Sequence, residues 1–195
     1  MRRCFLYLPV ILLCAACGLA QSHNRHVNSP PRSKAATDIR HFDFQKSIYR
    51  TDEELVRISH GRGIYQGHGR ETFSYNVEKV SVTYGDLNGD SSDEAAVTLY
   101  YTGGGTGAYS KGFLFSLQNG RLKLLTTFAG GDRADGGIKK VRIADGILSV
   151  QRNEPERMND VVVGLCCPKY LITTTYRWDG RRLIQVGEPE KVAVS

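Results

Sequence analysis

Three turn-forming dipeptides set the strongest limit on how this chain folds. They are Asn119-Gly120, Asp145-Gly146 and Asp179-Gly180, and each lies beside segments rich in β-branched, aliphatic or aromatic residues. Such dipeptides adopt positive φ at low cost, which matches the twist of a tight β-hairpin. The sequence therefore predicts consecutive hairpins, that is, an antiparallel meander from about residue 72 to residue 186.

Hydrophobic alternation supports the same interpretation. Residues 138–143 and 170–178 alternate between apolar and polar side chains, which is the period of a strand with one buried face. The opposite face is expected to be exposed to water or covered. Apart from one acidic loop, no internal repeat occurs at a fixed period, which argues against a complete β-propeller within the chain.

Residues 52–59 are expected to form one short helix. Thr51 is a good N-cap, and Glu54 lies three residues later, where it closes a capping box. An aliphatic run follows, and Gly61 is suited to ending the helix in a left-handed conformation. The predicted fold class is therefore mainly β, an antiparallel meander of sequential hairpins with one short N-terminal helix.

Residues 1–20 have the order of a signal peptide. Two arginines precede an apolar run that is too short to span a bilayer, and small residues follow. Cleavage before Gln21 would give a secreted or periplasmic protein, and the alternative is a lipid anchor on Cys17. Residues 21–37 are polar and are expected to be a disordered linker. Residues 38–195 suffice for a single mainly β domain.

The charge balance limits the class of partner. The chain has 26 Lys and Arg against 20 Asp and Glu, a formal net charge of +6. Its basic groups are not interleaved with aromatic residues in the manner of single-stranded nucleic-acid platforms. We therefore expect an exposed basic strand face, no nucleic-acid partner, and membrane attachment only if Cys17 is lipidated. The densest basic groups are Lys139, Lys140 and Arg142, and Arg181 with Arg182.

An acidic loop with oxygen-bearing side chains at alternate positions predicts a calcium site. Asp86, Asn88 and Asp90 occupy positions one, three and five, the Ser92 carbonyl falls at seven, and Glu94 falls at nine. Hard oxygen ligands at this spacing suit calcium. An EF-hand is excluded, because its position-six glycine and position-twelve glutamate are missing and strands should flank the loop. The alternative is a polar hairpin whose acids face water.

The same loop resembles the calcium loop of FG-GAP and VCBS-type repeats, which occur in integrin heads and bacterial exported proteins. The resemblance implies a loop between two strands of a blade, with ligand roles for Asp86, Asn88, Asp90 and Glu94. The chain departs from that pattern at Ser91, where glycine is common, and at Glu94, where aspartate is usual. Residues 82–113, 130–137 and 166–178 also resemble a group of bacterial exported proteins to which no activity is assigned.

Two further segments are candidate ligand contacts. Residues 130–137 combine four glycines with Asp132, Arg133 and Asp135, so either the backbone approaches a ligand closely or the segment is a long turn with a local ion pair. The glycine-rich residues 103–107 follow one pair of tyrosines and precede another tyrosine. Those rings could form a rim for a sugar or peptide, or serve strand packing. They are Tyr100, Tyr101 and Tyr109.

Cys166 and Cys167 are adjacent, which leaves four interpretations open. A bond between them would be strained, because neighbouring Cα atoms lie about 3.8 Å apart. A vicinal disulfide, a reactive thiol pair, a soft-metal site and two buried small side chains remain open. His60 and His68 are expected to be polar loop residues, since no nucleophile or further metal ligand accompanies them.

No motif in the sequence requires an enzyme. The nucleophile elbow, the zinc-protease helix and the Ser-x-x-Lys pattern are all missing. We therefore expect an exported, calcium-stabilised binding or interaction module whose partner is a protein or carbohydrate of the cell envelope or medium. The alternative is an exported hydrolase-like enzyme with an unrecognised site. Convergent acids or histidines in a deep cleft would favour the enzyme, and an aromatic rim would favour binding.

Overall fold

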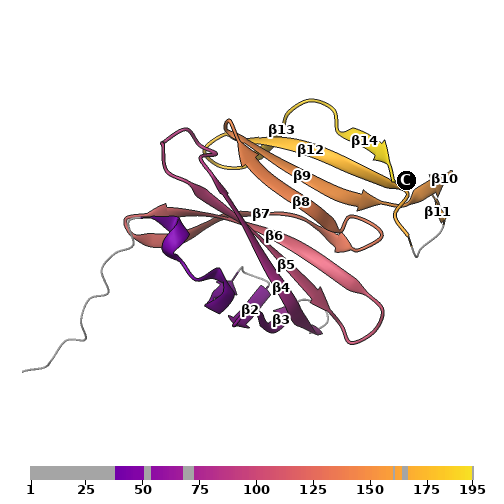
Figure 1. Cartoon of the computed structure of the whole chain (residues 1–195), viewed down its shortest axis with the longest axis horizontal. Coiled ribbons are helices and arrows are strands. Elements are labelled where there is room, and N and C mark those ends of the chain that lie inside the picture. Colours follow the sequence, from indigo (N-terminus) through magenta and orange to yellow (C-terminus); the bar gives the residue numbers. More distant parts are fainter. Residues whose placement is uncertain (1–37, 51–53, 68–72, 160, 164–166, 195) are drawn as a thin grey trace, which may run out of the picture. The chain divides into compact units, whose positions relative to one another are not determined.

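Antiparallel strands make up most of the chain in this computed structural model (Figure 1). The structure describes residues 38–50, 54–67, 73–159, 161–163 and 167–194, and all of them belong to one compact unit. The signal peptide and linker lie outside these residues and stay predictions. Within the described ranges, no helix is long and apolar enough to cross a membrane. The mainly β, antiparallel fold class is confirmed.

The first sheet is the predicted meander, since its seven strands pair in chain order. All of its pairings are antiparallel. Two single-turn 3-10 helices precede it, η1 (Ile39–His41) and η2 (Phe44–Lys46). The strands are β1 (Ile48–Arg50), β2 (Glu54–Ser59), β3 (Arg62–Gly67), β4 (Phe73–Gly85), β5 (Glu94–Thr102), β6 (Ala108–Gln118) and β7 (Arg121–Asp132).

The second sheet is formed by the C-terminal part of the chain. Its strands follow the order β13-β12-β9-β8, and β14 also pairs with β12. A separate two-stranded hairpin, β10 with β11, is inserted between β9 and β12. The strands are β8 (Ile138–Ala144), β9 (Ile147–Glu154), β10 (Glu156–Met158), β11 (Val161–Val163), β12 (Tyr170–Trp178), β13 (Leu183–Gln185) and β14 (Glu190–Ala193).

The predicted turn dipeptides all join paired strands. Asn119-Gly120 and Asp145-Gly146 form two-residue turns in which both residues have positive φ, the backbone that a type I′ hairpin requires. Asp179-Gly180 belongs to a longer loop, in which the Asp179 carboxylate accepts hydrogen bonds from the amides of Arg181 and Arg182, both at 2.8 Å. The local turn chemistry is therefore sufficient to place these hairpins.

The predicted helix at residues 52–59 is wrong over its described part, because Glu54–Ser59 is strand β2. Val56 and Ile58 are buried while Arg57 is exposed, which is an alternation of period two. Pairing with β1 and β3 on both sides outweighs the capping signal. Gly61 does have positive φ, but it forms a two-residue turn between β2 and β3.

Strands β5 and β6 are buried on both faces, which explains why their sequences are nearly continuous in apolar residues. Val97 and Phe113 face a first core that includes residues from η2, β1 and β2. Ala96 and Leu114 face a second core that includes residues from β8 and β9. The central strands thus separate two hydrophobic cores, and the second core joins the two sheets.

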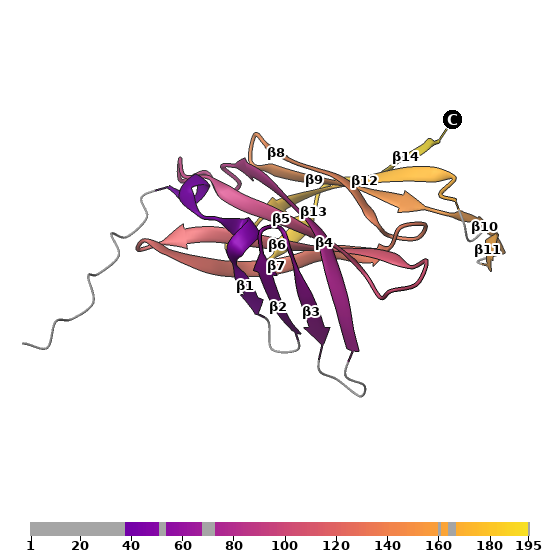
Figure 2. The ribbon, with the colours of Figure 1, turned by 60° about the horizontal axis from the view of Figure 1, so that its bottom comes forward.

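The first sheet curls over its own first core. Tyr49 of β1 lies 5.4 Å from Phe113 and 5.7 Å from Phe115 between ring centroids, although four strands separate β1 from β6 in the sheet. Strands β1 to β4 lie side by side in Figure 2. The curl brings β2 opposite β6, where Glu54 pairs with Lys111.

Candidate functional site

The acidic loop joins β4 to β5, as the sequence predicts, and Gly85 pairs with Glu94 at its base. Asp86 accepts hydrogen bonds from the amides of Gly89 (2.7 Å) and Ser91 (2.9 Å). Asp90 accepts one from the amide of Ser92 (2.8 Å). These contacts fold the loop around its own carboxylates. The backbone N–H groups that donate to them partly balance their negative charge.

Glu94 is the one buried carboxyl group of this loop and is 1% exposed. It accepts hydrogen bonds from the Leu87 amide (2.9 Å) and from Asn88 Nδ2 (3.0 Å). Burial raises the pKa of Glu94 to about 7 against the lowering effect of backbone hydrogen bonds from Leu87 and Asn88, and the nearby Asp90 and Asp86 raise it further. This carboxyl therefore titrates near neutral pH.

The donor chemistry of the loop suits calcium, because Asp86, Asp90 and Glu94 offer hard oxygen atoms. Their carboxylates already accept N–H groups, but a carboxylate oxygen has lone-pair capacity beyond one bond. Among the residues that the structure describes, no three or more His, Cys, Asp or Glu side chains are placed to hold a metal ion. The calcium site, including the Ser92 carbonyl, stays a prediction.

The loop is anchored at both ends of its span. Leu87 is 2% exposed and belongs to the second core. On the other side, Arg40 of η1 forms an ion pair with Asp93 at 2.5 Å and lies over the Tyr84 ring, 4.9 Å from its centroid. The N-terminal 3-10 helix and the second core therefore both hold the loop in place.

A second candidate site is a pocket of about 310 Å³, which we call the tyrosine pocket. It brings together two features that the sequence singled out separately, the tyrosines of β5 and β6 and the glycine-rich residues 130–137. One wall is the face of β5 and β6 that carries Tyr100 and Ser110, and the start of the second sheet provides the opposite side. Its lining residues are Glu78, Tyr100, Tyr101, Thr102, Ala108, Tyr109, Ser110, Arg133, Gly137, Ile138 and Asn153.

Tyr101 and Tyr109 alternate with Tyr100 and Ser110 along β5 and β6, so their rings lie on the opposite face of the sheet, toward the first core. These rings belong to a cluster of tyrosines. Tyr101 and Tyr109 stack at 5.7 Å and 22°, and Tyr75 contacts both, at 5.4 and 5.6 Å. A Cβ on Gly103 would lie 2.8 Å from the Tyr75 ring, and one on Gly107 would lie 2.9 Å from the Tyr109 hydroxyl oxygen. A side chain at either position would therefore have to displace one of these rings.

A buried polar group lies beside this ring cluster. Tyr65 is 2% exposed and stacks on Tyr101 at 4.5 Å. Glu54 lies beside Tyr65 and forms an ion pair with Lys111. Burial, and then the Glu54 carboxylate, raise the pKa of Tyr101 to about 12. The pKa of Tyr65 is raised by the same causes, so both hydroxyls are neutral at physiological pH.

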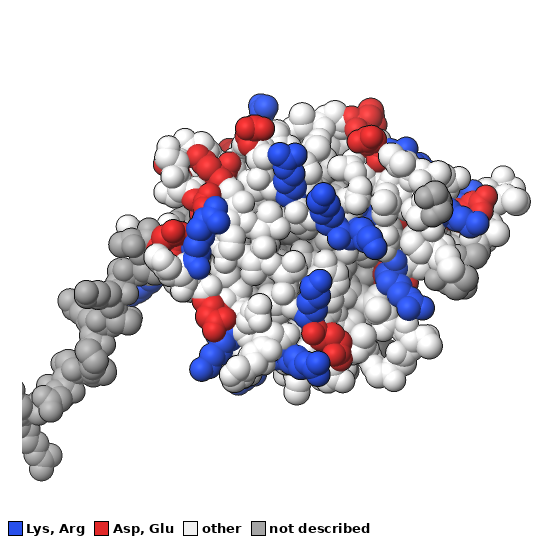
Figure 3. All heavy atoms as spheres, viewed as in Figure 1, with Lys and Arg blue, Asp and Glu red and all other residues white. Residues whose placement is uncertain are grey.

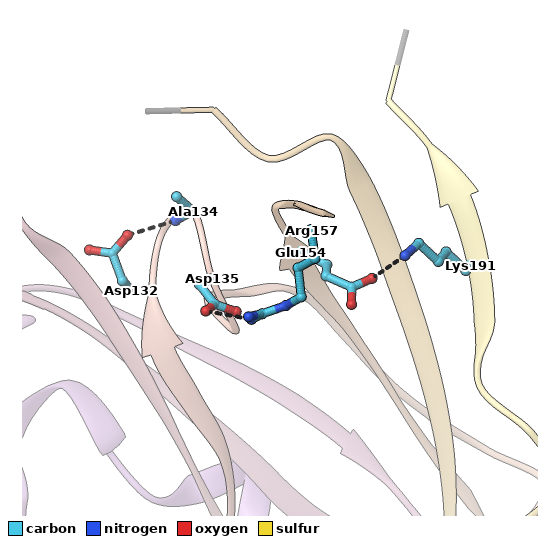
Figure 4. A network of polar contacts seen from close by, with 6 residues as sticks. All are labelled: Asp132, Ala134, Asp135, Glu154, Arg157 and Lys191. Atoms are coloured by element: carbon cyan, nitrogen blue, oxygen red, sulfur yellow. Dashed lines mark hydrogen bonds and ion pairs between the residues drawn. The ribbon is translucent and has the colours of Figure 1, made fainter. Parts of the chain in front are cut away.

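The segment of residues 130–137 is folded tightly on itself (Figure 4). Asp135 pairs with Arg157 at 2.8 Å, and Asp132 accepts a hydrogen bond from the Ala134 amide at 2.8 Å. A Cβ on Gly137 would lie 2.5 Å from the Asp132 carbonyl oxygen. Asp132 therefore serves the loop itself, Asp135 links it to β10, and Arg133 is the charged residue of this segment that lines the pocket.

The remaining predicted residues lie elsewhere. His60 is exposed in the turn between β2 and β3, 3.0 Å from Ser59 Oγ. Cys167 is exposed, whereas Cys166 and His68 lie outside the described residues, so the four interpretations of the cysteine pair stay open. The residues Lys139, Lys140, Arg142, Arg181 and Arg182 are exposed, as expected.

Sequence reasoning missed the inner half of the tyrosine cluster. Tyr65 belongs to a strand that the sequence did not assign, Tyr75 was not singled out although its strand lies within the predicted meander, and Glu54 was expected to cap a helix. Period-two burial in residues 54–67 was the signal that could have found them. Comparison of the chain with protein-family models, with curated proteins and with solved structures found no match.

Proposed function

We propose that this chain is an exported binding module whose ligand site is the tyrosine pocket. The observation that supports this most strongly is the cavity of about 310 Å³ between the Tyr100 and Ser110 face of β5 and β6 and the start of the second sheet. A preformed apolar cavity with a few convergent polar groups is the usual form of a ligand site. Export rests on residues 1–20, as argued from the sequence.

The position of the titrating carboxyl favours binding over hydrolysis. A general acid or base must reach its substrate and usually has a perturbed pKa. Within the described part of the chain, Glu94 is the carboxyl whose pKa is raised, and it is 1% exposed in the acidic loop. That carboxyl is too deeply buried to meet a substrate, so the hydrolase alternative gains no support.

Calcium has a stabilising role in this proposal. The acidic loop lies between β4 and β5, and β5 also provides Tyr100 and Tyr101. A calcium ion that neutralises the Asp86, Asp90 and Glu94 charges would stabilise the β4–β5 connection without lying in the pocket. Calcium removal should therefore lower the stability of the fold directly, and the affinity for the ligand only as a consequence.

The test is retention of native material on immobilised protein. Envelope and medium fractions are passed over the wild type and over Arg133→Ala, which removes an exposed pocket side chain. Arg142→Ala is the matched control, since Arg142 is exposed on β8 away from the pocket lining. We expect a component that the wild type and control retain and Arg133→Ala releases. Equal retention by all three proteins, or none, would overturn the proposal.

A further inference from the structure

One edge of β4 has no strand beside it over its second half. β4 is 13 residues long, but β3 pairs only with its residues Phe73 to Val77. Beyond that point β4 continues to Gly85, past the end of β3 (Figure 2). Strand β5 pairs with the other edge of β4 along the whole of this stretch. Residues 79–85 are therefore paired on one side, and in the described part of the chain no strand lies on the other.

The backbone along this edge has no other partner inside the protein. Among the residues that the structure describes, no backbone hydrogen bond outside the sheet involves residues 79–85. The chain does pass nearby through η1 and η2, but the backbone hydrogen bonds of residues 38–46 stay within that segment or reach Gly61. A strand edge in this state offers N–H and C=O groups at alternate residues to another extended chain.

A cavity of about 550 Å³ lies beside the same edge. β4 lines it with Val80, Val82 and Tyr84, the residues that face the first core. Their neighbours across the paired edge, Val97 and Leu99 of β5, are fully buried and do not line it. The cavity therefore opens on the unpaired side of β4, and we call the cavity and this edge the β4 groove. Its other lining residues are Phe42, Asp43, Phe44, Gln45 and His60.

The β4 groove is apolar inside and polar at its rim. Val82 and Tyr84 are half-buried, so part of their apolar surface meets water, whereas Asp43 and His60 at the rim are exposed. The Asp43 carboxylate already accepts a hydrogen bond from the Gln45 amide at 3.0 Å. Covering the apolar surface is favourable. An occupant should therefore place apolar groups inward and keep its polar groups toward the rim.

An extended peptide satisfies the edge and the cavity together. A peptide that adds to a free sheet edge gains main-chain hydrogen bonds, and its alternate side chains enter the pockets beside that edge. Because side chains alternate along a strand, every second residue of the peptide would face the cavity. Residues 21–37 of this chain do not fit this pattern, since they include two adjacent prolines and Val27 is their one large apolar residue.

We infer that the β4 groove binds an extended peptide of a partner protein, which pairs with residues 79–85 and places alternate apolar side chains in the cavity. The strand would continue the line of β3 and run antiparallel to β4, like every other pairing in this sheet. This site is separate from the tyrosine pocket, because Val80, Val82 and Tyr84 face the first core and that pocket faces the second sheet.

The pattern of the peptide is expected to matter more than its net charge. Figure 3 shows that basic and acidic side chains are both spread over the visible face of the molecule. An approaching peptide thus meets no single-sign field on this face that would select a strongly charged sequence.

The test uses a display library of nine-residue peptides in which apolar residues alternate with Ser, Thr or Lys. The comparator is a library of the same composition with its apolar residues in one block. We expect saturable binding of alternating sequences by the wild type. Val82→Thr places a hydroxyl group in the groove and should weaken this binding about tenfold. Val192→Thr is the matched control, because Val192 is 51% exposed on β14, and it should bind as the wild type does.

A selected peptide also tests strand addition on the wild type alone. Two versions carry N-methyl groups on alternate amides, so that each version blocks one side of the peptide strand. One version should lose binding, because its methyl groups face β4, and the other should keep it. Four results would overturn the inference: no binding of alternating peptides, equal binding of the block library, equal behaviour of the two methylated versions, and binding that Val82→Thr leaves unchanged. A dimer in light scattering that excludes the peptide would also overturn it, since a second copy would then cover the edge.

Discussion

At the scale of single residues, the protonation of Glu94 is expected to make the stability of the fold depend on pH. Its raised pKa means that the folded protein holds a proton that the unfolded chain releases above its ordinary value of 4.5. Stability contributed by this proton is fully present below pH 4.5 and is lost as pH rises toward about 7. In chelator, the free energy of unfolding should fall by up to about 1.4 kcal/mol per pH unit across this window.

Urea unfolding at several pH values in EDTA measures this effect. Glu94→Gln cannot ionise, so its stability should change less between pH 5 and pH 8 than that of the wild type. Other groups titrate equally in both proteins, which makes the difference between them the informative quantity. Parallel pH profiles for the two proteins would show that Glu94 ionises normally in the fold.

Gly112 shows how closely the second core is packed. A Cβ at this position would lie 2.3 Å from the ring of Phe128, a side chain that is 7% exposed. Gly112→Ala should therefore cost about 1–3 kcal/mol, which is typical of overpacking a core. Gly105→Ala is the matched control, because nothing lies within 4 Å of its added Cβ. Similar urea midpoints for the two variants would contradict this account.

At the scale of elements, the acidic loop allows a direct test of calcium. At free calcium about 100 times the dissociation constant, binding should add about 2.7 kcal/mol to the free energy of unfolding. Asp86→Ala should remove most of this increment. Asp179→Ala is the matched control, since Asp179 also accepts two backbone amides in a turn and should keep the full increment. Melting temperatures with calcium and with chelator measure all three proteins.

Two outcomes of this test would contradict the predicted calcium site. If the wild type melts at the same temperature in calcium and in chelator, the loop is a polar turn whose carboxylates are served by its own amides. A gain that survives Asp86→Ala would place the calcium site elsewhere in the chain.

The elements also show which parts of the fold the sequence could predict. Asn119-Gly120 and Asp145-Gly146 predicted their hairpins correctly, because positive φ at adjacent residues is a local requirement. The Glu54 capping signal failed, because the strand at Glu54–Ser59 is set by pairing with a strand on each side and by the Glu54–Lys111 ion pair across the first core. The sequence therefore predicted the turns, which depend on local chemistry, but it did not predict the curl of the sheet.

The same distinction applies to the candidate site. Tyr100 and Arg133 were each singled out from sequence, but their placement around one cavity depends on how β6 meets the start of β8. The link between these elements is a hydrogen bond from the Ile138 amide to Ser110 Oγ at 2.7 Å. Nothing in the spacing of a serine and an isoleucine 28 residues apart predicts that contact.

At the scale of the whole molecule, the shared second core predicts cooperative unfolding. Ala96 and Leu114 of the first sheet and Leu148 and Val150 of the second belong to one cluster. Trp178, the one tryptophan of the chain, packs against this cluster. Because the sheets share these contacts, its fluorescence and the far-UV circular dichroism should follow one common transition in urea.

Leu148→Ala makes this prediction quantitative. Leu148 is fully buried, so its truncation should cost about 2–5 kcal/mol, as expected for a core leucine. Both signals should move together to lower urea, because losing contacts in the shared core weakens both sheets at once. Ile184→Ala is the control, since Ile184 is 38% exposed and should shift neither signal appreciably. A tryptophan transition that precedes the circular dichroism transition would mean that the second sheet unfolds separately and that the tyrosine pocket opens before the first sheet is lost.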